Sequence, residues 1–276
     1  MHSYGNIIDT TSSSDTTSFE KKYRKFKIAL DYSSENTFKG RKNTTNIPIL
    51  SPFFKYIGKS GFFTQVSLVD VPTGKIKKVF DELDAGAGWI FNFSDQWDGS
   101  ISYMHYFYDS GVARLKSAVK SDLNTSVGFD WDILYSQLLF DINADNPKNS
   151  NKGKAIPKHT KDYTLTFANT HYFYFYFKEG RKLTASPEAD VLLGTQNFYA
   201  AYKGKLDATA HTKYQKQVTT FTLTAYILYL NVNYKIKKFA VGLTPSYTIP
   251  QNVPEGESST PFFVMSGRVS YTFRSN

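Results

Sequence analysis

The chain has 276 residues, with 20 Tyr, 23 Phe, no Cys and a formal net charge of +9. The lack of Cys excludes disulfide scaffolds and thiolate metal sites, and no run approaches the roughly 18 apolar residues that a membrane helix needs. A mean hydropathy of -0.40 beside an aromatic fraction of 17% favours a class in which only alternate residues meet hydrocarbon. The transmembrane β-barrel is such a class.

Apolar and polar residues alternate with a period of two over most of the chain from residue 21 onward, which predicts strands. In "KFKIALDY" (25–32), one face is aliphatic and aromatic while the other carries Lys and Asp. Short turns such as "GKSG" (58–61) and "KEGR" (178–181) then predict successive hairpins. Five hairpins are predicted at 50–69, 83–108, 122–143, 162–194 and 219–250, followed by a last strand at 262–273. We expect about twelve antiparallel strands in one up-and-down barrel.

The connections between these strands alternate strictly between short and long. Short links lie at 58–61, 94–98, near 132, 178–181 and 236–238, whereas long polar links lie at 33–48, 70–81, 109–121, 144–161, 196–217 and 251–260. Outer-membrane barrels have short periplasmic turns and longer extracellular loops. We expect aromatic residues to mark both membrane interfaces, including Tyr32, Tyr108, Tyr163 and Tyr247 at the extracellular ends.

The last strand, "SGRVSYTF", places Val269, Tyr271 and Phe273 on one face. It resembles the terminal strand of Gram-negative outer-membrane β-barrel proteins, with the small departure that three residues follow the aromatic Phe273. The pieces "SPFFKYIGKSGFF" and "TPSYTIPQNVP" are similar to uncharacterised barrels of the Bacteroidota type. The resemblance implies a porin-like outer-membrane protein that the barrel-assembly machinery inserts. A signal peptide would then be absent from this sequence, because residues 1–19 are polar and lack an apolar stretch.

This interpretation divides the chain into a flexible segment and one folded domain. Residues 1–20 are expected to be a flexible segment, and residues 21–276 the barrel. Strand parity then divides the side chains into two sets. The lipid-facing set is Phe26, Ile28, Leu30, Val127, Phe129 and Val269. The lumen-lining set is Lys25, Lys27, Asp31, Lys55, Asp84, Asp141, Glu188, Asp190 and Arg268.

The lumen-lining charges support two interpretations. They could grade a narrow pore for small polar solutes, or they could pair with one another, for example Arg268 with Glu188 or Asp190, and fill a closed interior that serves a structural or partner-binding role. A barrel of twelve strands lies between filled and open sizes, so size does not decide. Parity is ambiguous near Ala168 and between Ile227 and Leu228, where β-bulges would reset it. The facing of 172–177 and 228–232 is therefore left open.

The positive charge is dispersed in the long links, and no basic helix or RNP-like motif gathers it. We expect these loops to meet the phosphates of an anionic outer leaflet, lipopolysaccharide in an outer membrane, rather than nucleic acid. Solute identity and oligomeric state do not follow from the sequence.

An enzyme is the alternative to a channel or a structural barrel. A barrel lipid hydrolase would need a Ser and His within hydrogen-bond reach, and His105 or His171 with Ser100, Ser102 or Ser136 are the candidates. No G-x-S-x-G elbow is present, so we expect no catalytic residues. No two of the five His have ligand spacing, so neither a metal site nor a cofactor is expected. A soluble β-sandwich is the remaining alternative, and it would not need detergent.

Overall fold

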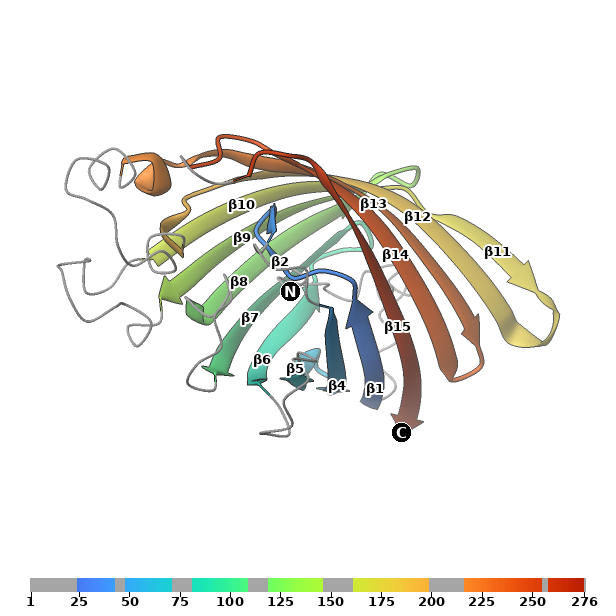
Figure 1. Ribbon diagram of the computed structural model, residues 1–276. Coiled ribbons are helices and arrows are strands. Elements are labelled where there is room, and N and C mark those ends of the chain that lie inside the picture. Colours follow the sequence, from blue (N-terminus) through green and yellow to red (C-terminus); the bar gives the residue numbers. More distant parts are fainter. Residues whose placement is uncertain are drawn as a thin grey trace.

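The computed structural model describes residues 24–42, 48–70, 81–108, 119–145, 161–198, 216–254 and 258–275. The segment 1–20, expected to be flexible, lies outside these ranges. Twelve antiparallel strands surround a single lumen (Figure 1), which confirms the up-and-down barrel. No helix in these ranges is both long enough and apolar enough to cross a membrane.

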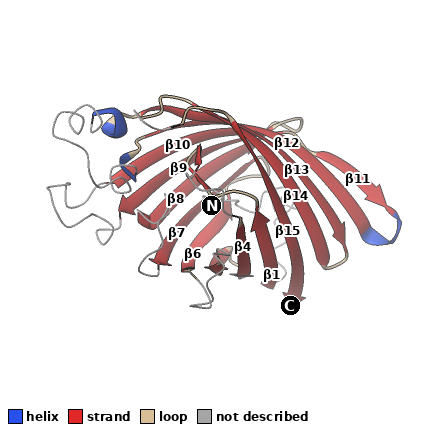
Figure 2. Cartoon of the chain, viewed as in Figure 1, coloured by secondary structure: helices blue, strands red, loops and turns tan. Residues whose placement is uncertain are grey.

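Each wall strand pairs with the next wall strand along the chain, and β1 pairs with β15 to join the two ends. The wall strands are β1 (Arg24–Ser33), β4 (Ile49–Ile57), β5 (Phe62–Val69), β6 (Glu82–Asn92), β7 (Trp97–Tyr108), β8 (Val119–Asp130), β9 (Tyr135–Asp145), β10 (Lys161–Thr170), β12 (Arg181–Gly194), β13 (Thr222–Ile236), β14 (Phe239–Pro250) and β15 (Phe262–Ser275). Strands make up nearly all of the wall in Figure 2.

The turns are sorted by end, as the sequence predicts. Links of two to four residues join β4 to β5, β6 to β7, β8 to β9, β11 to β12 and β13 to β14, and these define the short-turn end. The opposite, long-loop end carries every longer connection. Gly61 shows why one short turn needs glycine: its φ is +88°, and a Cβ there would lie 2.0 Å from the carbonyl oxygen of Ile90.

Large apolar side chains point away from the lumen along most of the wall. Leu30, Val127 and Leu228 are 45%, 42% and 50% exposed, whereas their neighbours Asp31 and Ser126 are buried. This pattern is inside out relative to a protein with a dry core. Exposed apolar surface of this extent requires a hydrocarbon environment.

The change of facing that the sequence suggests in β13 comes from one β-bulge, and this bulge does not lie at Ile227. The register of β12 against β13 shifts between Leu192 and Leu193, leaving Thr224 without a paired residue. From Ala225 to Leu230 less exposed and more exposed side chains alternate, with Ile227 buried and Leu228 exposed. Near Ala168, β10 runs unbroken to Thr170.

A short strand, β11 (Phe173–Phe177), continues β10 after a break at 171–172 and pairs with β12. All five of its side chains are exposed. The β11–β12 hairpin extends outward in Figure 1. Tyr172 and Tyr174 stack with parallel rings, and the ammonium of Lys182 lies 4.2 Å from the Tyr174 ring centroid. Tyr174 and Phe175 thus alternate between two faces of an extended ribbon.

The first long connection contains a second hairpin that belongs to no part of the wall. Strands β2 (Thr37–Phe38) and β3 (Arg41–Lys42) pair around Lys39 and Gly40, whose φ angles are 49° and 74°. Positive φ at both central residues is typical of a type I′ turn, which suits a two-residue hairpin. In Figure 1 this hairpin lies within the ring of strands. We call it the lumen hairpin (37–42).

Candidate functional site: the lumen and its hairpin

Arg41 fastens the lumen hairpin to the far wall. Its side chain is 1% exposed. Nε and Nη2 donate to Oε1 of Gln196 at 2.9 and 2.7 Å, Nη1 donates to the carbonyl oxygen of Thr224 at 2.9 Å, and Nη2 also donates to the carbonyl oxygen of Gln251 at 2.7 Å. Thr224 is the bulged residue, so the irregularity of β13 supplies one of these acceptors. A guanidinium suits this role because its donors form a rigid planar fork.

Lys39, at the tip of the lumen hairpin, forms a buried ion pair with strand β9 of the wall. Its Nζ lies 2.6 Å from Oδ2 of Asp141 on β9, and both side chains are almost fully buried. Asp141 also accepts a hydrogen bond from the Asn124 amide. Burial alone would lower the pKa of Lys39, but the carboxylates of Asp141 and Asp122 outweigh it and raise the pKa above its usual value. Lys39 is therefore a fixed positive charge at neutral pH.

An apolar cluster holds the other side of the hairpin. Phe38 packs edge-on against Phe198 with ring centroids 5.0 Å apart. The rest of the cluster is Met104, Tyr106, Val119 and Val218, with Tyr108 against it. The expectation that Tyr108 marks the extracellular interface is wrong, because this side chain faces inward and packs on the cluster.

The buried charges of the lumen are mainly acidic, although the chain as a whole is basic. Among the described residues the buried charged side chains are six carboxylates and three cations. The carboxylates are Asp31, Glu82, Asp84, Asp122, Asp141 and Asp162, and the cations are Lys39, Arg41 and Lys55. Two of the three cations belong to the lumen hairpin, so this hairpin supplies most of the compensating charge.

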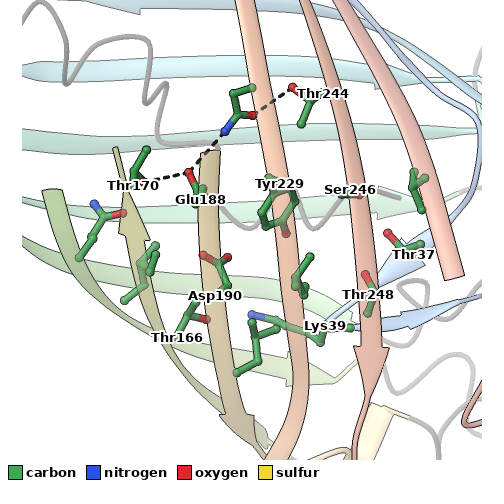
Figure 3. A pocket seen from close by; sticks show the side chains of 18 of the residues that line it. Thr37, Lys39, Thr166, Thr170, Glu188, Asp190, Tyr229, Thr244, Ser246 and Thr248 are labelled. Atoms are coloured by element: carbon green, nitrogen blue, oxygen red, sulfur yellow. Dashed lines mark hydrogen bonds between the residues drawn. The ribbon is translucent and has the colours of Figure 1, made fainter. Parts of the chain in front are cut away.

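A cavity remains between the hairpin tip and the wall formed by β10, β12, β13 and β14 (Figure 3). Its empty space is about 1130 Å³ and includes open solvent. Glu188, Asp190 and Tyr229 project into it in Figure 3. Most of the other polar lining side chains are hydroxyls and amides, including Thr166, Thr170, Asn231, Thr244, Ser246 and Thr248. Such a lining can hydrogen-bond polar solutes without binding them permanently.

The residues expected in the lumen are all on the inward-facing parity, but they are not gathered at one place. Asp31, Lys55, Asp84 and Asp141 are buried. Lys25, Lys27, Glu188, Asp190 and Arg268 are partly buried. Of the nine, only Asp141, Glu188 and Asp190 line the cavity.

Arg268 pairs with neither Glu188 nor Asp190. Its Nε and Nη2 donate to the two carboxylate oxygens of Asp31 at 2.5 and 2.9 Å. Asp31 is the residue directly opposite on β1. The pairing suggested from sequence is therefore wrong, because the nearest carboxylate across the β1–β15 junction satisfies the guanidinium first.

The residues expected to face lipid lie on the outer face. Ile28, Leu30, Val127 and Val269 are 48%, 45%, 42% and 44% exposed. Phe26 and Phe129 are less exposed because each packs on an aromatic neighbour, Tyr56 and Trp97 respectively. In the terminal strand, Val269, Tyr271 and Phe273 stand opposite Leu30, Ile28 and Phe26. The proposed terminal signal thus forms one edge of the junction that closes the barrel.

The Ser and His candidates do not form a catalytic pair. Ser100 is buried and bonds Ser126 at 2.8 Å, while His105 contacts Tyr103 on the outer face. His171 bonds the carbonyl oxygen of Ile133. Ser136 donates to Asn169. Across the described ranges, no cluster of three or more His, Cys, Asp or Glu could hold a metal ion.

Sequence reasoning missed the lumen hairpin, with Lys39 and Arg41, as well as Gln196 just after β12 and Tyr229 on β13. The sequence predicts only a polar link at 33–48 for this stretch. The available signal was the glycine of "TFKGR", because glycine is favoured at the second central residue of a two-residue hairpin turn. The partners of Arg41 are backbone carbonyls and an amide, which no sequence pattern identifies.

No protein-family model and no curated protein matches the chain. The KdgM porin is similar in structure over 90% of this chain and 99% of its own, at 10% sequence identity and a TM-score of 0.51. The NanC porin matches over 89% and 98%, at 9% identity and 0.50. LpxR from Salmonella typhimurium matches over 90% and 100%, at 9% identity and 0.48.

At these identities the likeness concerns the fold. A closed twelve-strand barrel with apolar residues outside and polar residues inside is a transmembrane β-barrel. Its solved neighbours are outer-membrane barrels. The chain is an outer-membrane β-barrel protein with a porin-like fold.

Proposed function

We propose that this barrel is a narrow channel for the passive passage of small polar solutes across the outer membrane. The observation that carries the proposal is the polar cavity beside the lumen hairpin, because a barrel filled for stability alone would have no space open to solvent and lined by hydroxyls, amides and carboxylates. The hairpin narrows the lumen and so limits the size of the solute. Two structures of similar fold, KdgM and NanC, are named porins.

Osmotic swelling of proteoliposomes tests this proposal. Vesicles containing the barrel are diluted into isotonic solutions of uncharged polyols of increasing size. We expect rapid swelling with glycerol and slow or no swelling with a trisaccharide, since the hairpin occupies part of the lumen. Absence of swelling with glycerol, in vesicles whose protein shows the folded gel mobility, would reject the channel.

A closed barrel with a structural or partner-binding role is the second candidate, and one observation favours it. Arg41 makes four hydrogen bonds across the lumen, and Phe38 is buried in an apolar cluster. A lumen hairpin held by these contacts could also be a permanent plug. The same swelling experiment separates the two functions.

The proposal also includes the partners of the barrel during assembly and in the membrane. The outer-face residues Val269, Tyr271 and Phe273 would be recognised by the barrel-assembly machinery while β15 is still unpaired. The long loops would contact the phosphates of lipopolysaccharide.

A further inference from the structure

Two carboxylates of β12 face the cavity without a cation beside them. Glu188 accepts hydrogen bonds from two neutral groups, the hydroxyl of Thr170 at 3.1 Å and the amide of Asn231 at 3.5 Å. Oδ1 of Asp190 is buried, and no described group donates to it. Figure 3 shows both side chains directed into the cavity. A carboxylate in this position favours a positively charged partner, because a buried charge without a counter-charge is destabilising.

Among the described residues, the one lysine that lines this cavity is already paired with another carboxylate. Lys39 lines the same cavity, but its ammonium lies 2.6 Å from Asp141 on β9. Neither Glu188 nor Asp190 forms an ion pair with any residue that the structure describes. The arrangement therefore leaves two acceptors for a cation that comes from solution.

The remaining walls indicate what kind of cation fits. Hydroxyls of Thr166, Ser246 and Thr248 line the same cavity as the carboxylates, while Leu192, Ile227 and Val264 supply apolar surface. An ammonium group has three N–H donors and can use a carboxylate and two hydroxyls together. An aliphatic chain can lie against the apolar side chains. A resident metal ion fits less well, because no group of three or more metal-binding side chains exists within the described ranges.

We propose that this cavity binds solutes that carry primary ammonium groups on a short aliphatic chain, with Glu188 and Asp190 as the residues that bind the ammonium. The proposal names the class of solute that the channel would carry. Binding at the site does not depend on the proposed channel function, whereas passage of the solute does. Alternate residues of a strand are about 6.6 Å apart, so each carboxylate can bind its own ammonium group. A short diamine therefore binds more tightly than a monoamine.

Isothermal titration of the folded full-length protein in detergent tests the site without any need for conduction. The probes are 1,4-diaminobutane, n-butylamine and 1,4-butanediol. We expect an affinity order of diamine, monoamine and diol, with the diol showing no measurable binding. Equal heats for the diamine and the diol would overturn the proposal.

Isosteric variants assign the binding to the two carboxylates. Glu188→Gln and Asp190→Asn keep the side-chain volumes, and each is expected to weaken diamine binding at least tenfold. The matched control is Asp98→Asn, which removes a carboxylate that bonds Tyr135 and does not line the cavity. This control should bind the diamine as the wild type does. If one of the two variants does not fold, the other alone carries the comparison, and unchanged affinity in it would refute the site.

Failure of the site and failure of the channel are distinguishable. Diamine binding that is lost in Glu188→Gln, in a protein that gives no glycerol swelling, would support the site and reject the channel. Glycerol swelling with diamine affinity indifferent to both variants would keep the channel and reject the site.

Discussion

The Arg268–Asp31 pair links the last strand to the first across the junction that closes the barrel. Removing one partner of a buried pair costs about 3–5 kcal/mol, and the Arg268 side chain keeps 19% exposure, so we expect Arg268→Glu to lower the unfolding free energy by about 2–3 kcal/mol. The double variant Asp31→Arg, Arg268→Glu should recover part of this loss. Urea unfolding in lipid vesicles measures both. A double variant no more stable than the single one would contradict a direct pair.

Arg268 also tests whether its face of β15 lines the lumen. If the channel conducts, replacing this cation with Glu adds negative charge along the path and should raise the preference for cations. Reversal potentials in a salt gradient report the change. Unchanged selectivity in a folded Arg268→Glu channel would show that the side chain is remote from the ion path.

Gly40 fixes how closely the lumen hairpin approaches the wall. Its φ is +74°, and a Cβ would lie 2.4 Å from the Cβ of Ala225. Gly40→Val should displace the hairpin and increase the current through the channel, because both the backbone and the contact oppose the side chain. Gly180→Val is the control, since Gly180 has φ +71° but nothing within 4 Å. Equal effects of the two changes on current would show that contact with the wall is unimportant.

At the level of elements, the lumen hairpin depends on a charge that persists to high pH. The pKa of Lys39 is raised in the folded protein, so the stabilising contribution of its pair with Asp141 is complete below the ordinary lysine pKa of about 10.4 and is lost as the pH rises through the higher folded value. We expect Lys39→Met to cost about 3–5 kcal/mol of unfolding free energy, with the same difference from wild type at pH 7 and pH 9. A difference that shrinks between these values would contradict the raised pKa.

The wall elements could be predicted from sequence, and the lumen hairpin could not, for a physical reason. A strand such as β8 has to satisfy lipid on one side and the lumen on the other, so its composition alternates and reveals its facing. The lumen hairpin has only two residues in each strand and is held by tertiary partners such as Gln196 and the Thr224 carbonyl. The sequence indicates an irregularity between Ile227 and Leu228, but the bulge lies at Thr224. The pattern is misleading there because Ile227 is an apolar residue that faces inward.

For the whole molecule, the orientation of neighbouring residues on β13 follows from the hydrocarbon around the barrel. Leu230 is 44% exposed on the outer face, while Asn231 faces the cavity and bonds Glu188. Leu230→Arg should cost roughly 2–4 kcal/mol if it lies near the bilayer midplane. Asn231→Arg should cost much less, because a cation there meets Glu188. The unfolding free energies of the two variants in lipid vesicles test this order. A larger loss in Asn231→Arg than in Leu230→Arg would show that the inward and outward faces of β13 are assigned the wrong way round.

Single-channel recording in planar bilayers addresses whether the barrel provides a continuous aqueous path past the lumen hairpin. Full-length protein with the folded gel mobility is compared with a variant in which residues 36–43 are replaced by a short Gly-Ser link. We expect small, discrete current steps from the wild type and larger steps from the variant, since the hairpin narrows the lumen without closing it. Silence of the wild type beside clear steps from the variant would mean that the hairpin is a plug, and silence of both would mean that no channel exists.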